Sequence, residues 1–515
     1  MRRVLLVLAV VVAACGETGV HTESAVERTT ASTSPTLPTS PTSPTSPPST
    51  SSTPTTQPQT PATTEPAITE PPAAPAPTQG VESIGDSLFP QLGTDELDVQ
   101  SYDVRIQYDP STQIIDADVT ITALVVGRPD RLVLDAGEMD IEAVAVDGAA
   151  ADFSLGNEEL LIQPATPVSV QQPVTIDVAY TDRASGNDSP VGLGIGWFAT
   201  PTGSFVLNEP DGAHSWLPSN DHPSDKATWR FELTVPSGVT AVANGELLEQ
   251  RAGPEGDTWV WEQREPMATY LAQILTGDYE VLDHGVVGSV PIVDVALSDD
   301  VEQMAPYFDL TDDQMVFFEP LLGPYPLDRY GLAFTDSFSG LAMETQGRSL
   351  FSRDDFPGGS PGVMQQLLLS HELAHQWFGN AVTPADWSDL WLNESFATYA
   401  QWLWLDHADV FPLETQARSN LAFRQDFAES TGEPTVENLF GFERYDGGAV
   451  VLHALRLEMG DEAFFTLLQR WVADNDGTSK RTADFTALAA EIAGRDLTAF
   501  FDTWLYAEDV PDEYP

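Results

Sequence analysis

Hydrophobic and polar residues alternate along the chain from about Gly85 to Gly277, in short runs that Gly, Asp, Asn and Pro separate. SYDVRIQYDP, DADVTITALVV and VTIDVAY are examples of such runs. Because successive side chains of an extended strand point to opposite faces, each run predicts a β-strand with one buried face. Several short strands in succession predict an all-β domain. Taken alone, this half of the chain would be a binding module.

The pattern changes after Tyr279. Strand-like runs such as VPIVDVALS and YGLAFT are mixed with segments such as VEQMAPYFDLTDDQMVFFEPLL, where apolar residues recur every three or four positions. This spacing predicts helices with one buried face, and such segments dominate after Met364. The predicted fold class is therefore multidomain α+β. An all-β domain over 84–278 precedes an α/β region that becomes helical over 279–515.

The first 15 residues have the pattern of an export signal. Arg2 and Arg3 precede an apolar run that continues to Ala14 and is too short to span a bilayer. The run ends Val-Ala-Ala-Cys, which resembles a bacterial lipobox, so we expect cleavage before Cys15 and lipid attachment to its thiol. The alternative is a plain signal peptide followed by an accidental cysteine. Cys15 is the only cysteine, so no disulfide can form within one chain.

A tract of Thr, Ser and Pro follows over residues 16–83. It lacks the apolar residues whose burial offsets the entropy of ordering, so we expect it to be disordered. A disordered tract after a lipid-bearing cysteine is a tether that holds a folded part away from a membrane. The predicted location is the cell envelope, at the outer face of the bacterial cytoplasmic membrane.

The charge of the chain argues against one class of partner. Acidic residues outnumber basic residues 79 to 22, and the formal net charge is −57. Such a field repels phosphates, so we expect no nucleic acid partner and no polybasic contact with anionic lipid. No run after the signal is long and apolar enough to predict a transmembrane helix. The net charge favours solubility and gives no information about which reaction, if any, the protein catalyses.

The candidate chemistry begins with the sequence HELAH at 371–375, in a segment whose apolar spacing predicts a helix. Residues four apart lie on one face of a helix, so His371 and His375 can aim two imidazoles at one ion. Glu372 is close enough in sequence to reach a water molecule held there. Two imidazoles and a carboxylate are what a catalytic zinc site needs, with a third ligand still to be found. The alternative is a helix with two ordinary histidines.

The third ligand is predicted nineteen positions after His375. Glu394 lies there in LWLNESFATYAQWLW, which has apolar and aromatic residues at helical spacing. A carboxylate on a helix that buries Leu390, Trp391 and Phe396 is unfavourable unless a cation neutralises it. Zinc supplies that cation. The sequence thus predicts one Zn²⁺ per chain, held by two histidines and Glu394.

Two stretches, HELAHQWFGN and WLNESFATY, closely resemble the zinc aminopeptidases of the aminopeptidase N family, which are gluzincins. The stretch FVLNEPDGAHSWLPSNDHPSDKATWRFELTV is similar to that family too. The resemblance covers roughly 84–515 and only the shorter form of the family's architecture. It implies a saddle-like N-terminal β domain and a thermolysin-like catalytic domain. It also implies that the substrates are peptides with a free N-terminus, from which N-terminal residues are removed.

The resemblance assigns substrate-binding roles as well. Glu344, in the stretch GLAMET, matches the family's glutamate that binds the free α-amine of the substrate. Glu209 would assist it, and Met343 would line the first side-chain pocket. Leu341 and Thr345 depart from the family's usual Gly-Ala-Met-Glu-Asn sequence.

The catalytic roles fall on Glu372 and Tyr445. Glu372 would be the general base. Tyr445, in RYDGGAVVL, resembles the family's tyrosine that donates to the oxyanion, although Asp446 and Gly447 depart from the usual pair. Two alternatives remain. A zinc endopeptidase would have no use for the amine-binding Glu344, and a non-catalytic surface-binding lipoprotein would tolerate loss of a ligand or base, whereas all of them are present here.

Overall fold

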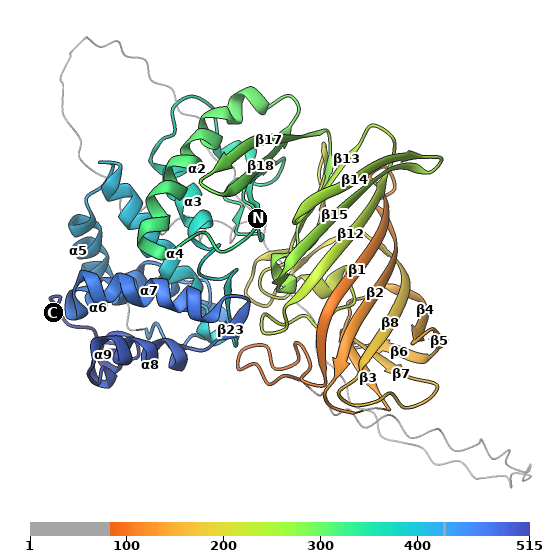
Figure 1. Ribbon diagram of the computed structural model, residues 1–515, viewed down its shortest axis with the longest axis horizontal. Helices are drawn as coiled ribbons and strands as arrows, with labels where there is room; N and C mark the ends of the chain where they lie inside the picture. Colours follow the sequence, from red (N-terminus) through yellow and green to blue (C-terminus); the bar gives the residue numbers. More distant parts are fainter. Residues whose placement is uncertain (1–82, 129, 426–428) are drawn as a thin grey trace, which may run out of the picture. The chain divides into compact units, whose positions relative to one another are not determined.

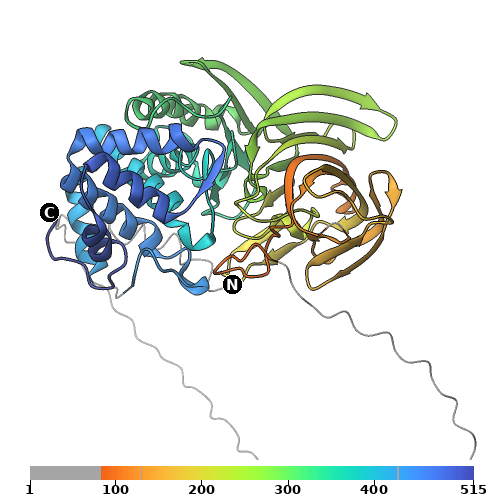
Figure 2. The ribbon, with the colours of Figure 1, turned by 60° about the horizontal axis from the view of Figure 1, so that its bottom comes forward.

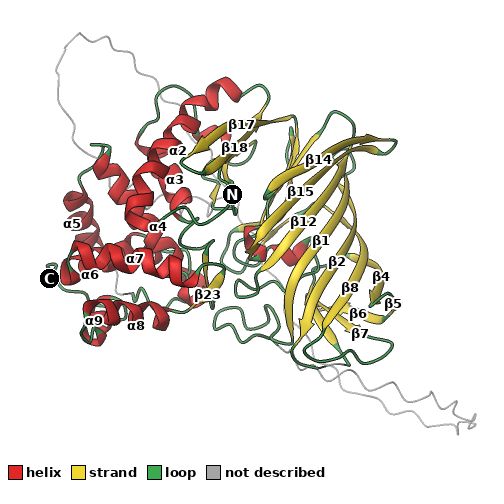
Figure 3. Ribbon diagram, in the orientation of Figure 1, coloured by secondary structure: helices red, strands yellow, loops and turns green. Residues whose placement is uncertain are grey.

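The computed structural model describes residues 83–515, except residue 129 and residues 426–428 (Figure 1). The predicted signal with Cys15, and the tether up to residue 82, lie outside the described residues. Strands fill the first part of the described chain and helices gather in the second (Figure 3). The predicted fold class is confirmed. The predicted domain boundary at 278/279 stays a prediction, in a chain where one strand ends at Gly277 and the next begins at Tyr279.

The largest sheet has eight strands in the order β14-β15-β12-β1-β2-β8-β4-β5, and Figure 2 shows it twisted and curved. Strands β1 and β12 pair in parallel, and the other neighbours are antiparallel. Buried and exposed residues alternate along β1, β2 and β12, which is the period of two in the sequence. The strands are β1 Leu97–Asp109, β2 Ile114–Val125, β4 Asp140–Val146, β5 Ala149–Ala150, β8 Pro173–Arg183, β12 Ala227–Val235, β14 Glu246–Gly253 and β15 Gly256–Met267.

Two smaller antiparallel sheets complete the β-rich half. One has the order β13-β16-β11-β10-β9 and the other the order β3-β7-β6. Strand β11 runs directly into the segment that carries Glu209, so this sheet positions one predicted site residue. The strands are β3 Leu132–Asp135, β6 Asp152–Gly156, β7 Glu159–Gln163, β9 Gly186–Asp188, β10 Gly194–Ala199, β11 Gly203–Leu207, β13 Thr240–Ala243 and β16 Ile274–Gly277.

A mixed sheet, in the order β17-β18-β19-β21-β20, opens the second half. Strands β18, β19 and β21 are parallel to one another, and β17 and β20 run antiparallel to their neighbours. Strand β20 ends at Met343, so Glu344 lies directly at the edge of this sheet. The strands are β17 Tyr279–Val287, β18 Val290–Leu297, β19 Leu332–Thr335, β20 Ala342–Met343 and β21 Ser349–Ser352.

The helices build a second hydrophobic core, in which α4 packs against both α3 and α6. Within the described chain, no helix is both long enough and apolar enough to cross a bilayer. The helices are α2 Val301–Leu322, α3 Val363–Ala374, α4 Trp391–His407, α5 Leu413–Arg424, α6 Asp446–Met459, α7 Asp461–Asn475, α8 Thr482–Ala493 and α9 Thr498–Trp504. Short 3₁₀ helices are η1 Ala213–Ser215, η2 Thr269–Leu271, η3 Arg353–Asp355, η4 Trp387–Asp389, η5 Val436–Asn438 and η6 Phe442–Arg444. Strands β22 Val382–Pro384 and β23 Thr478–Lys480 form a parallel pair.

The β-rich half contacts the loop that follows α3. Lys226 Nζ donates hydrogen bonds to the carbonyl oxygens of Asn380 (2.7 Å) and Ala381 (3.1 Å). The hydroxyl of Tyr270 donates to the carbonyl oxygen of Gly379 (3.2 Å). The loop after α3 directly follows His375, so side chains from the first half of the chain support the predicted metal site.

Candidate active site

The two histidines of the HELAH sequence face each other at the end of α3. The helix ends at Ala374, and His375 keeps helical dihedral angles (φ −57°, ψ −25°) as its C-cap. The two Nε2 atoms are therefore brought to 3.0 Å from each other. The Nδ1 atom of His375 is 3.1 Å from the carbonyl oxygen of Phe378, to which it donates as N–H. That hydrogen bond fixes the tautomer and leaves Nε2 as a ligand atom.

Glu394 approaches both histidines from the first turn of α4. Its Oε2 atom is 3.1 Å from His371 Nε2 and 3.3 Å from His375 Nε2. Every residue of α4 from Trp391 to Leu405 is buried, and Glu394 is 3% exposed. The structure thus brings the three predicted metal ligands together.

These three ligand atoms fit a zinc ion. Ligands arranged tetrahedrally at about 2.0–2.1 Å from one ion lie about 3.3 Å from one another, which is close to the separations seen here. His371, His375 and Glu394 would hold the ion. A second set, Glu344, Glu372 and His375, also has its ligand atoms within 4.8 Å of one another. Because His375 has only Nε2 to offer, one ion at a time can use it.

The charges around His371, His375 and Glu394 favour a bound cation. Burial opposes ionisation of Glu394, but the two imidazoles outweigh it and lower the pKa of Glu394 to about 2. Burial also disfavours a charged His375, yet the carboxylates of Glu344 and Glu394 raise the pKa of His375 to about 10. The protein therefore stabilises a positive charge at the centre of this cluster, which a metal ion supplies.

Three further carboxylates surround the cluster. Glu209, Glu344 and Glu372 are 9%, 3% and 5% exposed. Burial raises the pKa of each, and neighbouring carboxylates raise it further. Among the described residues, Glu209 Oε1 and Glu344 Oε1 have no hydrogen-bond partner. Two buried acceptors without donors, beside a metal cluster, form an acidic cluster whose charge suits a cationic group.

The backbone of Glu344 is held by two residues that sequence reasoning missed. Gln376 Nε2 and Asn380 Nδ2 both donate to the carbonyl oxygen of Glu344, at 3.1 and 2.6 Å. Both are buried, and both lie within the stretch HELAHQWFGN. The available signal was the pair of amide side chains within five residues after His375. They link the amine-binding candidate to the helix that carries His375.

Tyr270 was also missed. This residue of η2 is 1% exposed, and its hydroxyl accepts a hydrogen bond from Asn393 Nδ2 (3.4 Å) while donating to the loop after α3. Burial raises the pKa of Tyr270 well above its ordinary value, and the carboxylates of Glu344 and Glu209 raise it further. The hydroxyl therefore stays protonated, within the electrostatic field of these carboxylates. Its signal in the sequence was one polar ring in the apolar run MATYLAQIL.

Tyr445 lies beside the predicted metal ligands. Its ring stacks on that of His371, with centroids 6.0 Å apart and planes 18° apart. Burial and the carboxylate of Glu394 raise the pKa of Tyr445 well above its ordinary value. The phenol is therefore a hydrogen-bond donor at neutral pH. The structure brings it to the metal cluster, as a residue that donates to an oxyanion requires.

Leu341 and Thr345, which depart from the family's usual sequence near Glu344, both make contacts within the protein. The hydroxyl of Thr345 donates to the carbonyl oxygen of Arg348 and accepts from Gln273 Nε2 (2.8 Å), so it is engaged within the protein. Leu341 and Met343 belong to the hydrophobic core of the β-rich half. The assignment of Met343 to a substrate pocket stays a prediction.

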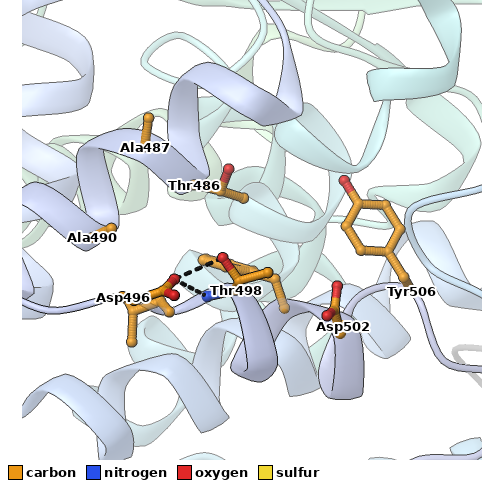
Figure 4. Close-up of a pocket in the computed structure, with 9 residues that line it drawn as sticks. Thr486, Ala487, Ala490, Asp496, Thr498, Asp502 and Tyr506 are labelled. Carbon is orange, nitrogen blue, oxygen red and sulfur yellow. Dashed lines mark hydrogen bonds between the residues drawn. The ribbon is translucent and has the colours of Figure 1, made fainter.

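A separate surface pocket lies between α8 and α9 (Figure 4). Asp496 lies in it and accepts hydrogen bonds from the backbone nitrogen (2.8 Å) and hydroxyl (2.6 Å) of Thr498. These bonds form a turn over residues 496–498 at the start of α9, whose N-cap residue is Leu497. None of the site residues predicted from the sequence lines this pocket.

Two histidines on one helix and a glutamate on the next define a zinc metallopeptidase centre of the gluzincin type. Residues 99–271 match the model of the peptidase M1 N-terminal domain, and residues 307–504 match that of the peptidase family M1 domain. The chain belongs to the M1 family of zinc metallopeptidases. The predicted relation to the aminopeptidase N family is confirmed, and Zn²⁺ is the cofactor that the family implies.

Named relatives agree with this assignment. Aminopeptidase N of Streptomyces lividans is 29% identical over 364 residues, which are 64% of this chain and 41% of that protein. A two-domain M1 zinc metallopeptidase crystallised with L-tryptophan is 30% identical, with a TM-score of 0.75 over 83% of this chain and 99% of the other. An M1 zinc metallopeptidase of Deinococcus radiodurans, crystallised with a Tyr-Ser-Ala substrate, is 29% identical, with a TM-score of 0.74 over 83% and 98%. The chain spans about half the length, or less, of the curated relatives it matches.

Proposed function

We propose that this chain is a zinc-dependent aminopeptidase that removes N-terminal residues from peptides. The observation that carries the proposal is the pair of buried carboxylates, Glu209 and Glu344, beside the three metal ligands. An N-terminal ammonium is a cation of the right size to bind both, and its position would set the scissile bond one residue from the metal. The solved relative with a Tyr-Ser-Ala substrate supports a peptide as the substrate class.

In the proposed mechanism, a zinc ion bound by the three ligands supplies a Lewis acid that acidifies water and polarises a carbonyl group. Glu372 accepts the proton of the attacking water and passes it to the leaving amine, because its buried carboxylate has a raised pKa and favours proton uptake. Tyr445 donates its hydroxyl hydrogen to the developing oxyanion. Glu344, assisted by Glu209, orients the substrate through its α-ammonium.

The buried carboxylates of Glu209 and Glu344 separate this proposal from its two alternatives. An endopeptidase must admit peptide chain on both sides of the cleaved bond, and a buried pair of acidic groups beside the metal opposes that because no cation is present in mid-chain. A non-catalytic binding protein has no need for a buried Glu372 within reach of a metal site. Both alternatives are disfavoured.

The proposal predicts metal-dependent hydrolysis of substrates with a free amine. Purified protein should release the fluorophore from a panel of aminoacyl-coumarins, lose this activity with a chelator and regain it with one equivalent of Zn²⁺ per chain. The matched control is the same panel with acetylated amines, which should remain intact because the ammonium is lost. Equal cleavage of free and acetylated substrates would contradict the aminopeptidase assignment.

We propose further that lipid on Cys15 anchors the protein at the outer face of a bacterial cytoplasmic membrane. The support is the Val-Ala-Ala-Cys sequence after an apolar export signal, followed by a Thr, Ser and Pro tract. In a bacterial host, the wild-type protein should incorporate labelled palmitate and sediment with membranes, and Cys15→Ala should do neither. Membrane sedimentation of Cys15→Ala at the wild-type level would show that the thiol is not the anchor.

A further inference from the structure

A buried ion pair joins the end of α5 to Glu443, which lies two residues before Tyr445 in the turn before α6. Arg424 Nε, at the end of α5, donates to Glu443 Oε2 at 2.8 Å, and both side chains are at most 1% exposed. The hydroxyl of Thr431 lies between them. It donates to Glu443 Oε2 (2.8 Å) and accepts from Arg424 Nη2 (2.8 Å). The cluster Arg424–Thr431–Glu443 is therefore hydrogen-bonded in a closed triangle.

The triangle is connected to Tyr445 through the intervening residue. Arg444 is fully buried, and its Nη1 donates to the carbonyl oxygens of Ser430 (2.8 Å) and Thr431 (3.2 Å). The carbonyl oxygen of Arg444 in turn accepts from the hydroxyl of Ser395 (2.6 Å), the residue after Glu394. The residue before Tyr445 is thus fixed to the triangle on one side and to the metal-binding helix α4 on the other.

The glycines after Tyr445 show how closely these groups pack. A Cβ atom at Gly447 would lie 2.6 Å from Glu443 Oε2, and a Cβ atom at Gly448 would lie 1.7 Å from Ser395 Oγ. A side chain at Gly447 would therefore require the carboxylate of Glu443 to move, and one at Gly448 would require the hydroxyl of Ser395 to move. Helices α4, α5 and α6, labelled in Figure 1, contact one another.

A buried ion pair is a poor source of stability, because apolar residues of similar volume often stabilise a protein as well. It does fix orientation, because the three hydrogen bonds of the triangle require one relative placement of the guanidinium, the hydroxyl and the carboxylate. A phenol that donates to an oxyanion needs such direction, because a shift of a fraction of an ångström weakens catalysis. Neither Arg424 nor Glu443 is among the predicted ligands or catalytic groups. An effect of this pair on catalysis must therefore act through Tyr445.

We propose that Arg424, Thr431 and Glu443 are positioning residues that hold the hydroxyl of Tyr445 at the metal centre. This inference rests on the proposed function, in which Tyr445 donates to the oxyanion. It predicts that the triangle governs the rate of the chemical step and leaves substrate binding unchanged, because the oxyanion exists only in the transition state.

Thr431→Val tests the inference in the full chain, because valine keeps the shape of threonine and replaces only the hydroxyl by a methyl group. We expect kcat to fall roughly ten- to a hundredfold with KM unchanged. Thr431→Ser, which keeps the hydroxyl and loses a methyl group, is the matched variant and should retain most of the rate. A larger loss in the serine variant than in the valine variant would make packing the cause and would overturn the inference.

A double-mutant comparison shows whether Thr431→Val lowers kcat through the hydroxyl of Tyr445 or through a general change in the active site. In a Tyr445→Phe background, Thr431→Val should reduce kcat no further, because the hydroxyl that it positions is absent. An equal reduction in both backgrounds would overturn the inference. Thermal unfolding of each variant verifies that the compared proteins are folded.

A measurement that needs no enzymatic activity tests this inference separately from the proposed function. 3-Fluorotyrosine introduced at position 445 alone should show a ¹⁹F resonance that moves or broadens in Thr431→Val and stays in place in Thr431→Ser. An unchanged resonance in folded Thr431→Val would overturn the positioning role. If the wild-type protein hydrolysed no aminoacyl substrate, the proposed function would fail, and the ¹⁹F result would still decide whether the triangle positions the ring.

Discussion

Glu372→Gln is expected to retain the metal and to lose turnover by about a hundred- to ten-thousandfold in kcat, the range that a general base contributes. Glutamine preserves the size of the side chain and cannot accept a proton. Glu372 is not one of the three ligands that converge within 3.3 Å of one another, so their arrangement should survive the change. Metal content by atomic absorption and kcat on an aminoacyl-coumarin measure the two effects.

The control for this substitution is Glu302→Gln, the same chemical change at an exposed position of α2. It should leave kcat and metal content at wild-type values. If Glu372→Gln kept more than about a tenth of the wild-type kcat with a full complement of zinc, another group would have to be the base.

Glu344→Gln is expected to lower kcat/KM for free-amine substrates by roughly thirty- to several thousandfold, which corresponds to about 2–5 kcal/mol for losing one partner of a buried charged hydrogen bond. The neutral amide removes the charge that pairs with the α-ammonium. Gln376 and Asn380 hold the backbone of Glu344, not its side chain, so the loop should keep its position. Steady-state kinetics on a free-amine dipeptide measures the change.

Acetylated versions of the same dipeptide serve as the reference for Glu344→Gln. They should remain uncut by both the wild-type protein and the variant, because an acetylated dipeptide presents no ammonium. A variant that lost no more than about twofold in kcat/KM on the free dipeptide would remove Glu344 from the amine site.

Local patterns in the sequence carried much of the fold. The alternation in SYDVRIQYDP predicted β1, because a half-buried strand needs an apolar residue at every second position. The spacing in VEQMAPYFDLTDDQMVFFEPLL predicted α2 for the corresponding reason. The order of strands in a sheet was beyond this reasoning. The parallel pairing of β1 with β12 joins segments more than a hundred residues apart, and pattern alone does not select a partner.

The same limit applies to the candidate site. His371 and His375 could be paired from the sequence because a helix fixes the geometry of residues four apart. Glu394 followed from a carboxylate on an apolar helix, and Glu344, Glu209 and Tyr445 came from resemblance alone. Tyr270 was missed, since its hydroxyl becomes part of the site only through contacts across 109 positions, to Gly379.

The sequence by itself predicted the chemistry of the centre: which side chains would bind a metal, which carboxylate lies beside them, and that helices present them. The tertiary structure alone decided what holds these groups in place. The hydrogen bonds of Lys226 to the loop after α3 and the Arg424–Thr431–Glu443 cluster before Tyr445 are examples. The physical reason is range. A helix sets distances within a few residues, whereas buried hydrogen bonds between distant segments exist only once the core has brought those segments together.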